Sequence, residues 1–249
     1  MATRSSVRAR LSPANRRRVR RVVDPVFRPV GSIARFRTTE RVCALTFDDG
    51  PDPASTPAIL DVLAEHDTRA TFFVMVPRAQ QHPDLIRRAV AEGHEVSLHG
   101  SDHGRLPELP MHAITAKLAD ARRDLESIVG RPITRMRPPF GSQSVRSYIA
   151  TRRAGLDPVV WSADAEDWVD RAPSAIAGTA LGRVEPGVVL LLHDAWEPDP
   201  LSDDVMPTFD RSEVLRRILV RFRETGFSGG SIEGLLARAP AVRTAWFRG

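Results

Sequence analysis

VCALTFDDGP, at residues 42–51, joins a short apolar run to two adjacent carboxylates and a turn. A run of this kind is typical of a buried strand, and the Gly-Pro pair that follows ends it. Asp48 and Asp49 leave the strand on opposite sides, so the two carboxylates can play different roles. The alternative is an ordinary Asp-Gly-Pro turn with two solvated acids. The rest of the chain decides between these interpretations.

Short apolar runs recur along the chain and alternate with segments of helical period. Repeated strand-helix units of this kind predict a parallel sheet covered by helices. We expect strands at residues 42–47, 70–76, 95–98, 133–137, 158–162 and 187–192, with a weaker one beginning near Phe227. We expect helices at residues 55–65, 83–92, 112–129, 144–154, 173–183 and 211–225. No low-complexity linker and no repeat interrupts this pattern, so we predict one domain.

Polar side chains follow the ends of successive predicted strands. They are Asp48 and Asp49 after the first strand, His99 after the third, Arg137 closing the fourth, Asp164 after the fifth and His193 after the sixth. Composition alone does not separate an open sheet from a barrel. Residues in these positions meet on one rim if the strands close into a barrel, whereas an open sheet spreads them along an edge. The pattern therefore favours the barrel.

His99 and His103 are four residues apart, so both imidazoles fall on one helical face or around one tight loop. With Asp49 from another strand end they form a set of two histidines and one carboxylate that leaves positions open. Such a set is typical of a catalytic rather than a structural zinc site. We expect one divalent ion, with Zn²⁺ favoured by ligand type and Co²⁺, Ni²⁺ or Fe²⁺ able to occupy the same set.

Five ordered motifs between about residues 41 and 238 resemble those of the polysaccharide deacetylases, carbohydrate esterases with the NodB-like domain. They are TFDDGP (46–51), HGSDH (99–103), RPPFG (137–141), DAEDW (164–168) and LLH (191–193). The resemblance implies an α/β fold, a distorted and incomplete (β/α)7-type barrel. Two positions depart from the usual family pattern: Gly100 replaces Ser or Thr, and Phe140 replaces Tyr.

The resemblance also implies roles for individual residues. Asp48 is the expected base, Asp49 with His99 and His103 the metal ligands, Arg137 the residue that holds the base, Phe140 the source of a backbone N–H facing the oxyanion, and His193 the general acid. We further expect Asp167 to orient the imidazole of His193. Trp168 and Leu191 are the candidate walls of a pocket for the acyl methyl group, although Leu191 taken alone fits ordinary strand packing.

The ligand set predicts a metal-dependent hydrolase. The resemblance implies that it removes an N-acetyl group from an acetamido sugar or a related small glycan. One alternative keeps the machinery but changes the substrate to a non-sugar amide, a formamide or an O-acetyl ester. A second alternative is an inactive glycan-binding protein of the same fold. The remaining histidines, His66, His82, His94 and His112, are expected at the surface or at helix caps.

Positive charge is concentrated at the start of the chain. Residues 1–41 hold 12 of the 36 basic residues beside only Asp24 and Glu40, so the remainder has a net charge of −5. An acidic body does not fit a nucleic-acid-binding domain. We expect residues 1–40 to form an arginine-rich arm, with weak contact to an anionic membrane as an alternative to a solvated tail, and residues 41–249 to form the catalytic domain.

The location and the partners of the protein are also predicted from simple patterns. The chain has no apolar stretch that fits a signal peptide or a membrane span, so we expect a cytoplasmic protein, with a peripheral position at the membrane as the alternative. The expected partner is the sugar substrate, and no obligate protein partner is evident. Cys43 is the only cysteine, so no disulfide within the chain is possible.

Overall fold

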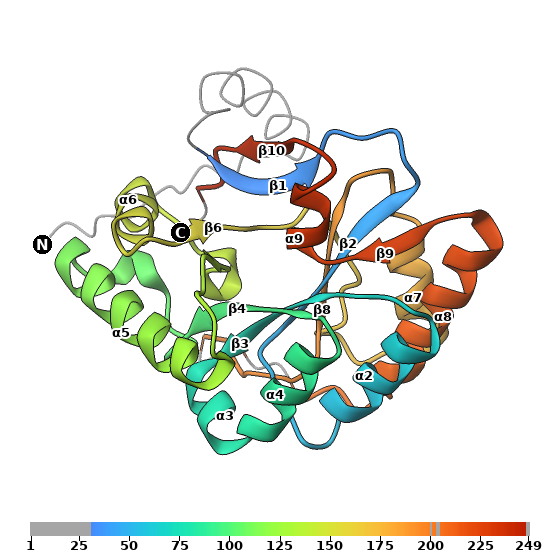
Figure 1. Ribbon diagram of the computed structural model, residues 1–249. Helices are drawn as coiled ribbons and strands as arrows, with labels where there is room; N and C mark the ends of the chain where they lie inside the picture. Colours follow the sequence, from blue (N-terminus) through green and yellow to red (C-terminus); the bar gives the residue numbers. More distant parts are fainter. Residues whose placement is uncertain (1–30, 200, 203–204, 248–249) are drawn as a thin grey trace, which may run out of the picture.

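The computed structural model describes residues 31–199, 201–202 and 205–247 (Figure 1). The strands are β1 (Ser32–Phe36), β2 (Val42–Asp48), β3 (Thr71–Met75), β4 (Glu95–Gly100), β5 (Arg135–Met136), β6 (Asp157–Pro158), β7 (Ala163–Asp164), β8 (Val189–His193), β9 (Ser228–Gly230) and β10 (Ala241–Thr244). The helices are α2 (Thr56–Glu65), α3 (Val76–Gln81), α4 (Pro83–Ala91), α5 (Met111–Val129), α6 (Val145–Arg153), α7 (Pro173–Leu181), α8 (Arg211–Thr225) and α9 (Ile232–Leu236), with the short 3-10 turns η1 (Leu106–Glu108) and η2 (Pro139–Gly141). Within these ranges, no helix has both the length and the apolar character needed to cross a membrane.

The main sheet is parallel and curled. Its strands lie in the order β6-β5-β4-β3-β2-β8-β7, and β9 pairs with the first residues of β2. The larger helices cover the outside of the curl, with α2, α3 and α4 next to one another and α5 at one end of the molecule (Figure 1). This arrangement confirms the predicted α/β fold, a single-domain incomplete barrel.

Alternation along β2 separates the two sides of the sheet. Cys43, Leu45 and Phe47 belong to the large cluster packed under the helices. Val42 and Ala44 belong to a smaller cluster inside the barrel, together with Phe73 and Val189. Because successive side chains of a strand point to opposite faces, Thr46 and Asp48 continue the inward-facing row. Strand β2 therefore sends Thr46 and Asp48 into the barrel.

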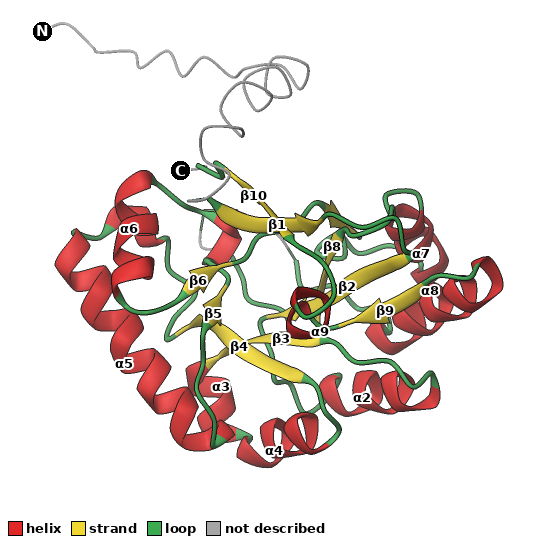
Figure 2. Cartoon of the chain, turned by 45° about the horizontal axis from the view of Figure 1, so that its top comes forward, coloured by secondary structure: helices red, strands yellow, loops and turns green. Residues whose placement is uncertain are grey.

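The barrel is open between β6 and β7, and β1 lies across this opening. Ile33 forms a parallel bridge with Val159, and Arg35 forms an antiparallel bridge with Val188. β1 also pairs antiparallel with β10, so the two strands lie side by side over the gap (Figure 2). A strand drawn from an early part of the chain thus completes the wall that the parallel strands leave unfinished.

The position of β1 differs from the expected boundary at residue 40. Residues 32–36 were assigned to a basic arm, but Ile33 and Phe36 are fully buried in the inner cluster. Burying two large apolar side chains stabilises this strand against the barrel, which outweighs the polar character of the surrounding residues. Residues 1–30 lie outside the described residues, so an arginine-rich arm there stays a prediction.

Several further elements differ from the sequence-based prediction, and helix α3 and strand β10 are among those that were not predicted. Of the strand expected at residues 158–162, only Pro158 lies in a strand, β6, and β7 begins one residue after the expected end. Between the two, the Val160 N–H donates to the carbonyl of Ile33 in β1. The helix α9 was not predicted, and it closes the end of the barrel at which the strands begin. Its first residues donate backbone N–H groups to the side chains of Thr71 and Glu95, and Ile232 joins the inner cluster.

A substitution at Gly187, just before β8, tests whether β1 closes the barrel. The φ of Gly187 is +76°, and a Cβ atom added there would lie 2.2 Å from the carbonyl oxygen of Phe36 in β1. We expect Gly187→Ala to lower the free energy of unfolding by roughly 3 kcal/mol or more, because backbone strain and a clash act together. Denaturation in urea measures this change.

Gly226→Ala is the matched control, since Gly226 has φ +70° but no atom within 4 Å of the added Cβ. Only the strain of a left-handed residue remains there, which costs about 1–2 kcal/mol. Equal losses of stability in the two variants would show that the contact between Gly187 and β1 does not close the barrel.

Candidate active site

Asp49, His99 and His103 meet at the carboxyl ends of β2 and β4. One potential ligand atom from each lies within 4.8 Å of the others. The Nε2 atoms of His99 and His103 are 3.2 and 3.3 Å from Asp49 Oδ1, yet that buried oxygen has no hydrogen-bond partner among the described residues. Burial opposes ionisation of Asp49, but the two imidazoles outweigh it and hold its pKa well below the usual range.

His99 is held in one tautomer. Its Nδ1 lies 2.9 Å from the carbonyl oxygen of Arg137, which can only accept a hydrogen bond. The Nδ1–H therefore donates, and Nε2 is the ring nitrogen that faces Asp49. A second contact that fixes the ring in this way is the usual support of a metal-binding histidine. His103 lacks such a partner for Nδ1 among the described residues, and its ring packs on Phe140 instead.

Asp48 is buried beside Asp49 and paired with a fully buried arginine. Arg137 Nη1 donates to Asp48 Oδ1 at 2.6 Å and to Thr46 Oγ1 at 2.9 Å. The guanidinium also lies 4.2 Å from the centre of the Phe73 ring. Burial lowers the pKa of Arg137 and its contact with Asp48 counteracts this effect. The pair fixes the direction of the carboxylate, because a buried charge without its partner is strongly unfavourable.

His193 and Asp167 form a second buried pair on the opposite side. His193 Nδ1 lies 2.7 Å from Asp167 Oδ1, and the His193 backbone N–H donates to Asp167 Oδ2 at 2.8 Å. Burial disfavours the charged imidazole, but the Asp167 carboxylate outweighs it and raises the pKa of His193 to about 9. Since Nδ1 is engaged with Asp167, the Nε2 atom of the ring is the one free to act on a bound molecule.

Phe140 lies at a sharp backbone turn in η2. Its φ of 57° is in the left-handed region, which few non-glycine residues adopt. The ring is held from two sides, by His103 at 4.2 Å between ring centroids and by the guanidinium of Arg105 at 3.9 Å. Such backbone strain persists only where the surrounding structure enforces it, so the contacts with His103 and Arg105 hold Phe140 in this conformation.

These groups surround one cavity of about 280 Å³. Among the predicted site residues, it is lined by Asp48, Asp49, His99, His103, Phe140, Trp168, Leu191 and His193. The other two, Arg137 and Asp167, contact Asp48 and His193 from behind. The structure thus brings all ten predicted residues into one region, while the role of each remains a prediction.

Six lining residues were not among the predicted site residues: Gly141, Trp161, Trp196, Glu197, Asp199 and Arg211. Three of them belong to the loop at residues 195–199, directly after the strand that ends in His193. Arg78 of α3 binds this loop through Glu197 Oε1 at 2.7 Å and the Trp196 carbonyl at 3.1 Å. Arg105 binds it through Asp199. The loop is therefore an ordered wall of the cavity.

Asp194 supports the turn that carries Asp49. The carboxylate is 1% exposed, accepts the Gly50 N–H at 3.1 Å and accepts the Thr56 hydroxyl at 2.7 Å. Burial raises its pKa to about 7. A Cβ atom at Gly50 would lie 2.0 Å from this carboxylate, which explains the glycine there. Glu166, an acid within the fourth motif, instead forms ion pairs with Arg171 and Arg183.

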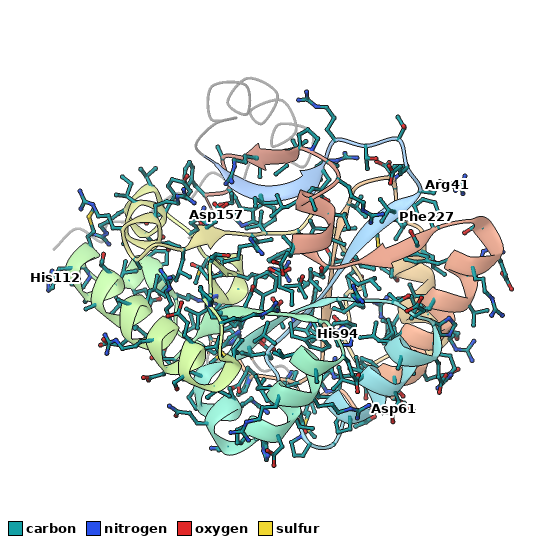
Figure 3. All side chains as sticks on the ribbon, viewed as in Figure 1. Arg41, Asp61, His94, His112, Asp157 and Phe227 are labelled. Atoms are coloured by element: carbon teal, nitrogen blue, oxygen red, sulfur yellow. The ribbon has the colours of Figure 1, made fainter. Side chains whose placement is uncertain are left out.

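His94 corrects one expectation about the other histidines. His112 is exposed on α5, but His94 lies inside the molecule with 2% of its surface exposed (Figure 3). Its Nδ1 accepts the backbone N–H of Ala70 at 3.1 Å, and Phe72 packs edge-on against its ring. Burial lowers the pKa of His94, so it is a neutral residue of the interior, on the side of the sheet away from the cavity.

The sequence is similar to those of known deacetylases. The family description "Polysaccharide deacetylase" matches residues 36–159. A chitooligosaccharide deacetylase of Sinorhizobium fredii is 38% identical over 185 residues, which cover 74% of this chain and 86% of the relative. The peptidoglycan-N-acetylglucosamine deacetylase PgdA of Listeria monocytogenes is 33% identical over 184 residues, 74% of this chain but 39% of that protein.

The fold is similar to that of solved structures. A family 4 carbohydrate esterase from Streptomyces lividans, solved in complex with acetate, superposes with a TM-score of 0.69 at 27% identity. The match covers 82% of this chain and 99% of the esterase. The curled parallel sheet and its helices are therefore common to both molecules.

The His193–Asp167 pair predicts a pH dependence of stability. The folded pKa of His193, about 9, lies above the value of 6.5 for an unperturbed histidine. A raised pKa stabilises the fold fully below pH 6.5, and this contribution is lost as the pH rises through 9. In metal-free protein we expect the free energy of unfolding to fall by up to about 3 kcal/mol more in the wild type than in His193→Gln between pH 6 and pH 10. Parallel pH profiles of the two proteins in urea denaturation would contradict this assignment.

Proposed function

Because this chain belongs to the polysaccharide deacetylase family, we propose that it is a metal-dependent hydrolase that removes the N-acetyl group of an acetamido sugar. One observation carries the proposal: Asp49, His99 and His103 meet at one end of a cavity that also exposes Asp48 and His193. The metal-ligand candidates, the base and the acid are thus gathered around a space that can hold a single small group.

The residues at the metal-ligand positions fit a divalent ion. Two imidazole nitrogens and one carboxylate oxygen face one another, and the oxygen is buried without a hydrogen bond from the described residues. Such an arrangement is unfavourable unless a cation is shared among the three groups. When bound, the ion would polarise the acyl carbonyl and make the attacking water more acidic. The N,N,O set favours Zn²⁺, and Co²⁺ or Ni²⁺ are the alternatives.

Asp48 is the proposed base. It lies in the cavity wall next to Asp49 and accepts the proton of the attacking water through the oxygen that Arg137 leaves free. Arg137 keeps the carboxylate aimed, since the guanidinium is fully buried and Asp48 is the counter-charge that it contacts.

Phe140 and His193 act on the two atoms that change charge. The backbone N–H of Phe140 is the proposed donor to the carbonyl oxygen as negative charge develops there, and the fixed turn orients it in advance. The leaving amine must gain a proton before the C–N bond breaks. His193 supplies it from Nε2, while Asp167 holds the ring and favours its protonated form.

The walls of the cavity support a sugar as the substrate. Trp168 and Leu191 lie beside His193 and form the proposed pocket for the acetyl methyl group. Trp161 and Trp196 add aromatic faces, which bind the apolar faces of sugar rings. The named relatives, which deacetylate chitooligosaccharides or peptidoglycan N-acetylglucosamine, support the same substrate class. A non-sugar amide, a formamide and an O-acetyl ester are the competing substrates.

Replacing the base and the acid tests the reaction. Asp48→Asn and His193→Gln each remove a proton-transfer group, so we expect acetate release from chitooligosaccharides to fall by about 10²- to 10⁴-fold. Asp61→Asn, an exposed acid on α2, is the control and should keep the wild-type rate. Wild-type turnover in both site variants would refute the proposed roles. Faster hydrolysis of a simple amide or ester than of any acetamido sugar would change the substrate class.

Replacing the ligand candidates tests the metal site without using activity. We expect Asp49→Asn and His103→Ala to lower the affinity for Zn²⁺ by at least about tenfold, because each removes a ligand atom. Elemental analysis after dialysis against a dilute zinc buffer measures this loss, and His112→Ala serves as a surface-histidine control. Equal zinc content in all three variants would place the ion elsewhere. Chelation should also stop acetate release, and added Zn²⁺ should restore it.

A further inference from the structure

Arg211 is a cavity-lining residue that none of the five motifs contains. It is the first residue of α8, and its side chain is 9% exposed. Its Nη1 lies 3.4 Å from Asp167 Oδ2, 3.4 Å from the Asp167 carbonyl oxygen and 3.3 Å from the His193 carbonyl oxygen. The guanidinium thus contacts both members of the His193–Asp167 pair and also reaches the cavity.

An arginine at the first position of a helix is electrostatically unfavourable. The N-terminal end of a helix has positive potential, which disfavours a cation in the first turn. The Asp210 side chain satisfies the backbone N–H groups of Ser212 and Glu213, so helix capping does not require the arginine. The guanidinium instead turns towards the barrel, where the Phe209 ring lies 5.1 Å away. Its position is explained by its contacts with Asp167 and His193.

The surroundings of these contacts are dry. Phe47, Leu192, Val214 and Leu215 enclose the crevice around Asp167, His193 and Arg211, which has no space for a water molecule. Charges interact strongly in such surroundings. The Asp167 carboxylate receives the ring N–H, the backbone N–H of His193 and the charge of Arg211. Its negative charge is therefore divided between an imidazole and a guanidinium.

We propose that Arg211 is a positioning residue for the deacetylation reaction: it holds Asp167 as an anion and takes up part of its charge, so that His193 stays aimed at the cavity and can release its proton. This inference rests on the proposed function. With Arg211 absent, the whole charge of Asp167 would act on the imidazole, and His193 would give up its proton less readily to the leaving amine. The other charged groups near His193 are Asp48 and Asp49 at the end of β2.

The dependence on the leaving group distinguishes this role from simple structural support. An amine must be protonated to leave, whereas the 4-nitrophenolate of an aryl acetate leaves without a proton. We expect Arg211→Met to lower kcat for an N-acetylated chitooligosaccharide at least about tenfold with KM changed less than threefold, and to leave hydrolysis of 4-nitrophenyl acetate close to the wild-type rate. Arg211→Lys, which keeps the charge, should recover most of the kcat.

Arg217→Met is the matched control, because Arg217 lies on the same helix, is about half exposed and pairs with Glu213. It should behave as the wild type on both substrates. If Arg211→Met does not fold, the Lys variant still tests the proposal. A normal kcat in Arg211→Met, an equal loss on both substrates, or a rise in KM alone would overturn the proposal. A Lys variant that loses kcat at least about tenfold on both the amide and the ester would overturn it as well.

A spectroscopic measurement separates failure of this inference from failure of the proposed function. The His193 ring N–H shared with Asp167 should give a proton NMR resonance far downfield, identified by its loss in His193→Gln. We expect this resonance in the wild type and in Arg211→Lys, and a shift further downfield in Arg211→Met, because the whole charge of Asp167 then acts on the ring N–H. An unchanged resonance in the Met variant overturns the positioning role whether or not the wild type releases acetate. Absence of acetate release from every sugar tested refutes the function alone.

Discussion

The buried ion pair between Arg137 and Asp48 is the interaction on which the rest of the site depends. Arg137 has no exposed surface, so its charge is tolerated inside the barrel only while Asp48 stays in contact with it. The backbone carbonyl of the same arginine orients His99. One residue thus fixes the direction of the proposed base and the tautomer of a candidate metal ligand, and it couples two strand ends that are far apart in the sequence.

The parallel sheet was predictable because each strand-helix unit carries its own local pattern of apolar residues. The differences arise where a contact between distant segments decides the structure. β1 was hidden because its buried residues, Ile33 and Phe36, stand among arginines, and only the opening in the barrel gives them a place. The expected strand 158–162 is absent beyond Pro158 for the same reason, because the Val160 N–H donates to β1.

The predicted site residues came from strand ends, where the alternation of side chains dictates which ones point inwards. That rule predicts that Asp48, His99 and His193 point inwards, but it says nothing about side chains that belong to helices and loops. Arg211 is the first residue of an amphipathic helix, and from the sequence alone it would be predicted to lie at the surface. Trp196 belongs to a polar, proline-bearing loop whose position depends on Arg78 from another element. Their places in the cavity follow from packing between elements and carry no local sequence pattern.

The pairing of β1 with β10 also affects how the molecule assembles. It joins segments from opposite ends of the described chain, and one of its contacts, from Arg243 to the carbonyl of Gly31, links residues 212 positions apart. Contacts so distant in sequence bring a large entropic cost of loop closure and form slowly. During translation the parallel strands leave the ribosome well before β10 does. The pairing of β1 with β10 is therefore a late event in biosynthesis, and β1 lacks its antiparallel partner until then.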